Sequence, residues 1–404
     1  MILAGAHLVL PDRILRAGSL RLDSGVIAAI SPTLIPAAPG EKIIDLAGLY
    51  IAPGFIDLHI HGALGRDTME ATPDAFDTIC RHHAAGGTTS LCLTTVAAPL
   101  DHLLAVLAAA SAYRDAPPTG ARLLGIHLEG PYFSLEKRGA HLPSLIRNPD
   151  PAEWTRLLAH SDIITQMTLA PELPGALPLI QALAATGIIA SVGHSDAWDD
   201  EVAAAFAHGL SHATHTYNCM SSARRRGPYR AAGVLEYILG EPAILCEVIA
   251  DARHVSPTLL PLLRRAKGID GIALITDATA GAGLPPESRF MLGETPCVVR
   301  DDVALTADGA ALAGSTSTMI RCVRNMVNLC DLSLVEAVRM ASSNPARALR
   351  IHQRKGAIAP GLDADLVILT PDLEVHQTWV AGHPMSDPPP SLAATHSDRP
   401  AYLS

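Results

Sequence analysis

The segment "GFIDLHIHG", residues 54–62, sets His59 and His61 two positions apart at the end of an apolar run. Alternate side chains of a β-strand point to the same face, so Phe55, Asp57, His59 and His61 project together, with the aliphatic residues between them behind. Two imidazoles on one face indicate either a metal site or a chance pair of core histidines. The residues at the ends of the other strands decide between these interpretations.

The middle of the chain alternates apolar, β-branched runs with helical segments. One helical segment, 100–113, places Leu103, Leu104 and Leu107 on one face. The apolar runs occupy residues 55–61, 88–95, 123–129, 163–170, 188–194, 210–215, 244–250 and 271–277. Eight buried strands with helical crossovers predict an α/β fold with a parallel sheet, closed into a (β/α)8 TIM-like barrel of about 300 residues. A doubly wound open sheet is the alternative architecture.

Both ends of the chain are rich in strand signals. The segment "SLRLDSGVIAAI" (19–30) predicts a hairpin around Asp23-Ser24-Gly25, and residues 361–383 alternate strands and turns. We therefore expect three parts: a small β-sandwich domain from residues 1–52 and 355–384, the barrel from 53–354, and a loosely ordered C-terminal tail at 385–404.

The composition restricts the functional class. Hydrophobic residues make up 49% and charged residues 17% of the chain, which is typical of a globular protein. The net charge of −10 argues against a general nucleic-acid or anionic-membrane binder, and no apolar run reaches the roughly 18 residues of a membrane span. The seven cysteines include no C-x-x-C pair, which favours reduced thiols. We expect a cytoplasmic protein without nucleic-acid or membrane partners.

Five predicted strands end in residues that can bind a metal ion. These residues are His59 with His61, Glu129, His194, His215 and Asp277. A lone histidine is more often a hydrogen-bonded core residue than a ligand, and either carboxylate alone is compatible with a cap. Barrel enzymes place their chemistry at the carboxyl ends of the strands, so the coincidence at five ends favours a divalent metal site that activates water. Asp277 is then the expected general base.

Seven motifs resemble those of the amidohydrolase superfamily and, more closely, of its N-acetylglucosamine-6-phosphate deacetylase family. They are "PGFIDLHIHG", "HLEGPY", "GHSDA", "THTYNCM", "ADARHV", "ITDATAGAG" and "LAGSTSTM". The resemblance runs from about residue 20 to 380, and no lysine ends a strand, which disfavours dihydroorotase-like and hydantoinase-like proteins. It implies a hydrolase that removes the N-acetyl group from N-acetylglucosamine-6-phosphate or a close amino-sugar phosphate, giving glucosamine-6-phosphate and acetate.

The resemblance also implies roles for individual residues. Glu129, His194 and His215 would bind the principal metal ion, and Asp277 would be the catalytic aspartate. The implied substrate contacts are Ala140, His141, Asn218, Cys219, Arg226, His254, Leu312, Ala313 and Gly314.

The resemblance implies that His254 would polarise the acetyl carbonyl or hold the sugar, and that His141 would contact a sugar hydroxyl. It also implies that Arg226 would hold the 6-phosphate, that the backbone at 218–219 would line the substrate, and that the loop 312–314 would close over the acetyl group.

The cofactor implied is a divalent metal, zinc first, with iron, cobalt or manganese as alternatives. Some family members carry Gln and Asn at the positions of His59 and His61 and hold one ion, whereas two histidines leave room for a second. One or two ions per subunit are therefore expected. The resemblance further implies a homodimer, with a partner subunit touching the phosphate.

Departures from the family pattern leave alternatives open. Thr216, Cys219, Ala252 and Arg253 differ from the residues common in the family, which leaves the exact sugar undecided. The arginines of "ARRRGPYR" (223–230) form either a solvated charge run or a phosphate pocket. Two other functions are deacylation of an unphosphorylated amino sugar or N-acyl amino acid, and a non-catalytic scaffold, which the intact ligand set disfavours.

Overall fold

The computed structural model of the chain describes residues 1–385. The predicted tail at 385–404 therefore lies outside the described residues, apart from Met385. None of the helices in the described part is long and apolar enough to cross a membrane.

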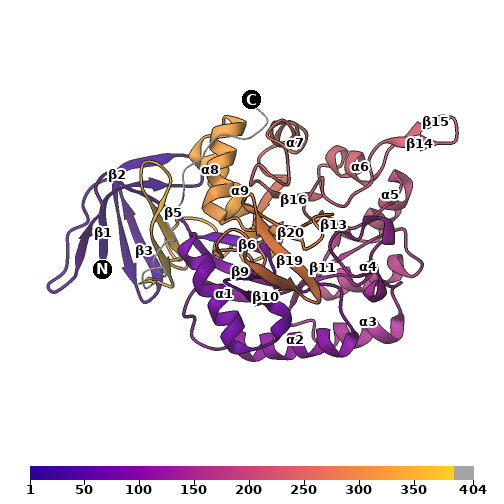
Figure 1. Cartoon of the computed structure of the whole chain (residues 1–404). Helices are drawn as coiled ribbons and strands as arrows, with labels where there is room; N and C mark the ends of the chain where they lie inside the picture. The colour runs from indigo at the N-terminus through magenta and orange to yellow at the C-terminus, as the bar shows by residue number, and fades with distance from the viewer. Residues whose placement is uncertain (386–404) are drawn as a thin grey trace.

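Eight parallel strands form a barrel in the middle of the chain (Figure 1). In chain order they are β6 (Phe55–Ile60), β9 (Thr88–Thr94), β10 (Arg122–Glu129), β11 (Ile164–Leu169), β12 (Ile189–Val192), β13 (Leu210–Ala213), β16 (Leu245–Ile249) and β17 (Ile272–Ile275). Each coincides with one of the eight predicted runs. A parallel bridge joins Ile60, the last residue of the first strand, to Ala278, three residues beyond the last strand, so the sheet closes and the open-sheet alternative is excluded.

Helices connect these strands, as the alternating pattern predicts. They are α1 (Pro73–Ala85), α2 (Leu100–Arg114), α3 (Pro151–Leu158), α4 (Ala176–Thr186), α5 (Asp199–Ala207), α6 (Val234–Gly240) and α7 (Leu259–Lys267), and α8 (Met319–Cys330), α9 (Leu334–Ala341) and α10 (Ser343–Ala348) follow the last strand. Helix α2 buries Leu103 and Leu107 against the barrel, with Leu104 half-buried at the edge of the same face. Burial of this stripe holds the helix on the sheet.

Both ends of the described chain contribute to a second sheet beside the barrel (Figure 1). Its strands are β1 (Ile2–Val9), β2 (Ile14–Asp23), β3 (Val26–Ser31), β4 (Ile43–Asp45), β5 (Tyr50–Pro53), β22 (Leu366–Leu369), β23 (Val375–Val380) and β24 (His383–Pro384). The expected hairpin at 19–30 is confirmed as β2 and β3. Ile27 of β3 and Trp379 of β23 belong to one buried cluster although their strands lie far apart in the sheet order, so the sheet curls around its own core.

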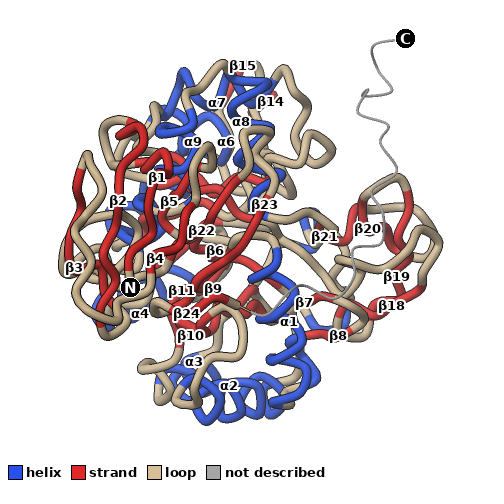
Figure 2. The backbone as a smooth tube through the Cα atoms, turned by 90° about the vertical axis from the view of Figure 1, so that its left-hand side faces the viewer, coloured by secondary structure: helices blue, strands red, loops and turns tan. Residues whose placement is uncertain are grey.

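Two insertions extend from the carboxyl ends of barrel strands. The hairpin of β14 (Arg224–Arg226) and β15 (Tyr229–Ala231) follows β13 and projects beyond α5 and α6 (Figure 1). A four-stranded sheet follows β17 and forms a separate lobe (Figure 2). Its strands are β18 (Arg289–Leu292), β19 (Thr295–Arg300), β20 (Val303–Thr306) and β21 (Leu312–Ser315).

Asp57 joins the two strands where the barrel closes. Its side chain is fully buried, and it accepts hydrogen bonds from Thr276 Oγ1 at 2.6 Å and from the backbone N–H groups of Thr276 and His59 at 3.2 Å. Burial raises the pKa of Asp57 to about 7, although these hydrogen bonds favour the ionised form. The carboxyl group therefore ties strand one to strand eight directly below the two histidines.

We expect Asp57→Ala to lower the free energy of unfolding by about 2–4 kcal/mol, because it leaves three buried donors without an acceptor. Urea unfolding followed by circular dichroism measures this change. Asp57→Asn is the matched control, since its amide oxygen still accepts a hydrogen bond, and its loss should be smaller. Equal stability of the alanine variant and the wild type would show that the closure does not depend on Asp57.

Candidate metal centre and active site

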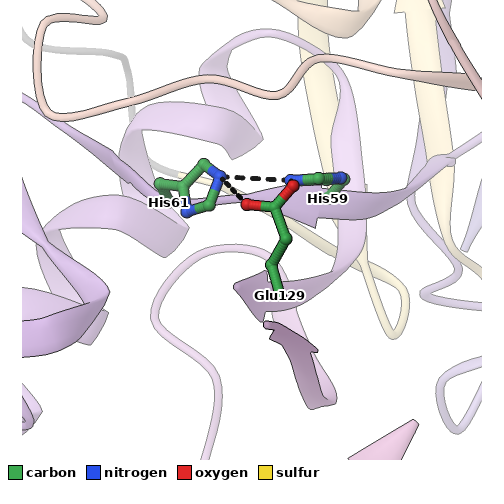
Figure 3. Close-up of side chains that lie close together, drawn as sticks. All are labelled: His59, His61 and Glu129. Carbon is green, nitrogen blue, oxygen red and sulfur yellow. Dashed lines mark hydrogen bonds and ion pairs between the residues drawn. The ribbon is translucent and has the colours of Figure 1, made fainter. Parts of the chain in front are cut away.

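His59 of strand β6 and His61, one residue beyond that strand, face Glu129 at the end of strand β10 (Figure 3). His59 Nε2 and His61 Nε2 lie 3.1 Å apart. Glu129 Oε1 is 3.6 Å from His59 Nε2, and Glu129 Oε2 is 3.3 Å from His61 Nε2. All three side chains are buried. His59 and His61 therefore converge on a carboxylate from another strand.

Two further histidines reach the same carboxylate from strands five and six. Glu129 Oε1 lies 3.3 Å from His194 Nε2 and 3.1 Å from His215 Nε2, and these two nitrogens are 3.1 Å apart. The other ring nitrogen of His194, Nδ1, lies 2.8 Å from the carbonyl oxygen of Lys137. Donation to that carbonyl holds one proton on Nδ1, so Nε2 is the nitrogen that gives up its proton when an ion binds.

Asp277 completes the cluster from the end of strand eight. Its Oδ1 is 3.4 Å from His59 Nε2 and 3.2 Å from His61 Nε2. Its backbone N–H donates to the carbonyl of His59 at 2.9 Å, and its carbonyl accepts from Ser315 N at 2.7 Å. These backbone bonds fix the carboxylate between the barrel rim and strand β21.

The backbone bends sharply at three cluster residues. His194, His215 and Asp277 each lie two residues beyond the last residue of their strand and have φ values of 50°, 31° and 51°. Residues other than glycine adopt this left-handed region only at a cost of about 1–3 kcal/mol, and such strain is concentrated at functional sites. Here the bend turns each side chain from the strand direction into the mouth of the barrel.

The carboxylates and imidazoles of the cluster strongly perturb one another. Burial favours the neutral form of His61, but hydrogen bonds to Asp277 and Glu129 outweigh it and raise its pKa to about 9. The pKa of His194 rises to about 10, because Cys219 and Glu129 outweigh the opposing effect of burial. Burial raises the pKa of both carboxyl groups, yet the imidazoles, His59 first, hold the pKa of Glu129 and of Asp277 well below the usual range.

The cluster fits a divalent cation. Two nitrogen ligands about 2.1 Å from a tetrahedral ion lie roughly 3.4 Å apart, close to the separations of 3.1 Å between the paired ring nitrogens. Two imidazole nitrogens at such a distance cannot both carry a proton toward each other, so each pair shares either a proton or a cation. The predicted ligands Glu129, His194, His215, His59 and His61 are all brought together.

His141 approaches the cluster but presents a proton instead of a lone pair. Its Nε2 is 3.5 Å from Glu129 Oε2, and its Nδ1 accepts a hydrogen bond from Ala97 N at 3.3 Å. Burial lowers the pKa of His141 to about 4, so the ring is neutral and its proton is on Nε2. This N–H group borders a pocket lined by Ala97, Ala140 and Thr295, which suits a hydrogen bond to a bound substrate.

His254 is held by a neighbour that the sequence reasoning did not identify. Its Nδ1 lies 2.7 Å from Asp251 Oδ2, while its Nε2 is buried without a hydrogen-bond partner. Burial lowers the pKa of His254, but Asp251 and Asp277 outweigh it and raise the pKa above the usual value. The pair therefore presents an oriented donor at the end of strand seven.

The other predicted substrate contacts lie around the cluster. Gly314 has a φ of 69°, and a Cβ at this position would come within 2.6 Å of Asp277 O, so the close approach requires glycine. Its neighbours on β21 differ in exposure, because Ala313 is buried and Leu312 is 38% exposed. Asn218 Nδ2 donates to the carbonyl of His215 at 3.2 Å.

Ala140 and Cys219 also border the site. The carbonyl of Ala140 accepts from Thr295 Oγ1 at 3.0 Å, which ties the loop of His141 to the β18–β21 lobe. Cys219 is half-buried and interacts with the ring of His194, whose pKa it helps to raise.

Arg226 is not brought to the cluster within one chain. It lies on the exposed β14–β15 hairpin, where it forms an ion pair with Asp200 at 2.9 Å and lies 5.0 Å from the centre of the Trp198 ring. Arg224 binds the neighbouring Asp196 at 2.6 Å. The hairpin that carries both arginines projects from the barrel beyond α5 and α6 (Figure 1).

Three buried polar residues near the site were missed by the sequence reasoning: Asp251, Glu247 and His127. A signal existed for two of them. Glu247 is a carboxylate inside an otherwise apolar strand run, and His127 lies two positions before Glu129, on the same strand face. Asp251 has no such signal, because its contact with His254 depends on the bend of the loop.

Comparison with known proteins gives consistent results. Residues 50–385 match the model of the amidohydrolase family. The N-acetylglucosamine-6-phosphate deacetylase of Vibrio furnissii is 35% identical over 388 residues, covering 95% of this chain and 96% of that protein. The N-acetylgalactosamine-6-phosphate deacetylase of Escherichia coli O157:H7 is 38% identical over 364 residues, covering 90% and 93%.

A solved structure shows the same similarity in three dimensions. It is a mutant N-acetyl-D-glucosamine-6-phosphate deacetylase from Mycobacterium smegmatis in complex with N-acetyl-D-glucosamine-6-phosphate. It has a TM-score of 0.87 and 34% identity, and the match covers 95% of this chain and 99% of that one.

We expect ion binding to release protons at pH 7. His61 and His194, with pKa values of about 9 and 10, carry protons in the ion-free protein, and an ion binds only the unprotonated nitrogen. Raising the pH from 7 to 10 removes these protons, so the apparent affinity for the ion should increase with pH. Calorimetric titration in buffers of different ionisation enthalpy counts the released protons.

His141→Gln is the control for proton release, because a ring with a pKa of about 4 has no proton to lose through this route at pH 7. This variant should release as many protons as the wild type. Ion binding without proton release in the wild type would contradict the electrostatic description of the cluster.

Proposed function

The chain belongs to the amidohydrolase family, and from this premise we propose that it removes the N-acetyl group from N-acetylglucosamine-6-phosphate or a close amino-sugar phosphate, giving glucosamine-6-phosphate and acetate. The observation that carries the proposal is the position of Asp277, whose carboxylate faces the cation-binding cluster of Glu129 and four imidazoles. Relatives named for this reaction cover most of the chain, which supports the choice of substrate.

The residues suit a divalent metal cofactor. Glu129, His194 and His215 would hold the principal ion, and His59 with His61 would hold a second. Imidazole and carboxylate ligands suit zinc, and also iron, cobalt or manganese, so we propose zinc as the first candidate. When bound, such an ion polarises the acetyl carbonyl and lowers the pKa of the attacking water.

Asp277 transfers the proton in the proposed reaction. Its depressed pKa keeps it ionised, so Oδ1 accepts the proton of the attacking water as the water oxygen adds to the carbonyl carbon. The amine cannot leave as an anion, so Asp277 returns this proton to the nitrogen when the C–N bond breaks. One carboxylate therefore serves as base and then as acid.

Two imidazoles outside the ion ligands are suited to the substrate oxygens. His141 holds its Nε2–H beside the cluster, where it can donate to the acetyl oxygen as negative charge develops. His254, oriented by Asp251, is the second donor and suits either the acetyl oxygen or the sugar. The geometry at Glu129 favours His141 for the acetyl oxygen, a role additional to its expected contact with a sugar hydroxyl.

Phosphate recognition in this proposal uses the arginine hairpin of a second subunit. The side chain of Arg226 is 51% exposed, and the hairpin that carries it projects from the barrel (Figure 1), so it can reach another copy. We therefore propose a homodimer in which Arg226 approaches the phosphate of substrate in the partner. The seven free cysteines support a reducing, cytoplasmic location.

The galactosamine epimer is a second candidate substrate. A relative named for N-acetylgalactosamine-6-phosphate is 38% identical, and one named for the glucosamine compound is 35% identical. These values are too close to choose between the epimers, so acetate release from both phosphorylated sugars should be compared.

Asp277→Asn should lower kcat by several orders of magnitude while the protein stays folded and still binds metal. The amide occupies the same space but cannot accept a proton from water. Acetate release under saturating substrate, with metal content measured in the same sample, tests this expectation. Turnover close to that of the wild type would refute the assigned role.

Arg226→Ala should lower kcat/KM for N-acetylglucosamine-6-phosphate by about 10–100-fold and leave the slow reaction of N-acetylglucosamine unchanged, because only the phosphorylated sugar loses an ionic contact. Arg225→Ala, on the same hairpin, is the matched control. Equal effects of Arg226→Ala on the two sugars would exclude the phosphate role.

Mixing Arg226→Ala with Asp277→Asn tests whether Arg226 acts across subunits. A mixed dimer contains one site with an intact Asp277 and an intact Arg226 from the partner, so part of the activity should return. If the mixed sample has only the summed activity of the two variants assayed separately, Arg226 does not contribute to the partner's site.

A further inference from the structure

Beneath the ion ligands, the barrel interior holds a second layer of buried polar side chains. His127, Gln166, Thr168 and Glu247 come from strands three, four and seven and are at most 1% exposed. Barrel interiors are usually filled with branched apolar residues, and a buried carboxylate needs a partner. Packing alone therefore does not account for these buried polar side chains.

Glu247 has one satisfied and one unsatisfied oxygen. Its Oε1 accepts a hydrogen bond from Gln166 Nε2 at 2.7 Å, whereas its Oε2 is buried without a hydrogen-bond partner. The Nδ1 atom of His59 is also buried without one, and it lies 3.9 Å from Glu247 Oε2. The two unsatisfied atoms thus face each other.

The separation of 3.9 Å exceeds a direct hydrogen bond by only about 1 Å, and the site is closed to solvent. A small rotation of the His59 ring brings Nδ1–H into direct hydrogen-bond contact with Glu247. His127 does not compete for this carboxylate, because its Nε2 lies 2.6 Å from Thr168 Oγ1.

The opposite nitrogen of His59 faces the ion ligands. His59 Nε2 lies 3.1 Å from His61 Nε2 and 3.6 Å from Glu129 Oε1. A proton held on Nδ1 by Glu247 leaves Nε2 with a free lone pair. A carboxylate behind a ligating histidine is a common way to fix the ring orientation and to raise its basicity.

The other ligand histidines are supported differently. His194 Nδ1 contacts the backbone carbonyl of Lys137, and the Nδ1 atoms of His61 and His215 have no hydrogen-bond partner. Among the described residues, His59 is the one ligand histidine whose Nδ1 faces a buried carboxylate. Glu247 therefore acts on one ligand selectively.

We propose that Glu247, held in place by Gln166, is a positioning residue that fixes the orientation and tautomer of His59 and thereby strengthens the ion-binding step that uses His59. The inference rests on the metal site in the proposed function, but not on the identity of the sugar. Glu247 does not contact the reacting atoms in this arrangement.

The test is a titration of the ion-free protein with zinc against a chromophoric chelator. His59→Asn first identifies which binding step uses His59. Glu247→Gln keeps the shape of the side chain and removes its charge, and it should weaken that same step by about 10–100-fold. Every other step should stay within about twofold of the wild type.

Asp251→Asn is the matched control. It removes the carboxylate behind His254, an imidazole outside the ion ligands, so zinc affinity should not change. Unchanged affinity of the His59 step in Glu247→Gln would overturn the inference, as would a His59→Asn variant that binds zinc like the wild type. Circular dichroism checks folding of each variant.

If Glu247→Gln does not fold, Gln166→Met replaces it. This change keeps the carboxylate but frees it from its holder, and it should weaken the His59 step by about three- to tenfold. A change below twofold would overturn the inference. Because zinc affinity is measured without substrate, this test of Glu247 remains valid even if the proposed deacetylase activity is disproved.

Discussion

Burial of the Glu129 carboxylate is the constraint around which the site is built. The side chain is 3% exposed, and an isolated charge at such a position is prohibitively unfavourable. Four ligand imidazoles and one that carries a proton surround it instead. These groups compensate the carboxylate only if they supply positive charge, as protons in the ion-free protein or as a metal ion.

The barrel satisfies this constraint by bringing ligands from separate strands to one rim. Parallel closure places the carboxyl ends together, so residues as far apart in sequence as His59 and Asp277 come within 3.4 Å. The backbone adopts left-handed φ values at His194, His215 and Asp277. Extensive burial in the surrounding sheet offsets that strain, which explains why strained ligands are joined directly to the most regular part of the fold.

Sequence periodicity predicted the barrel well because its strands are buried on both faces and appear as unbroken apolar runs. The same logic brought together the residues proposed to bind the ion, since they lie at or near strand ends. It did not predict the partners of those ligands: Glu247 reaches His59 across the barrel, and Asp251 reaches His254 only because the loop bends at Ala252 with a φ of 64°. Such contacts depend on side-chain positions that no local pattern encodes.

The proposed substrate contacts lie in a different part of the fold from the proposed ion ligands. Leu312, Ala313, Gly314 and Arg226 lie on insertions beyond the strands, where length and sequence can change without disturbing the closed sheet. In the proposed mechanism the barrel fixes the position of the water-activating groups, and the insertions select the sugar. Relatives named for two epimeric phosphorylated sugars resemble this chain to a similar degree, so under this proposal the difference between epimers is to be sought in the hairpin and the β18–β21 lobe.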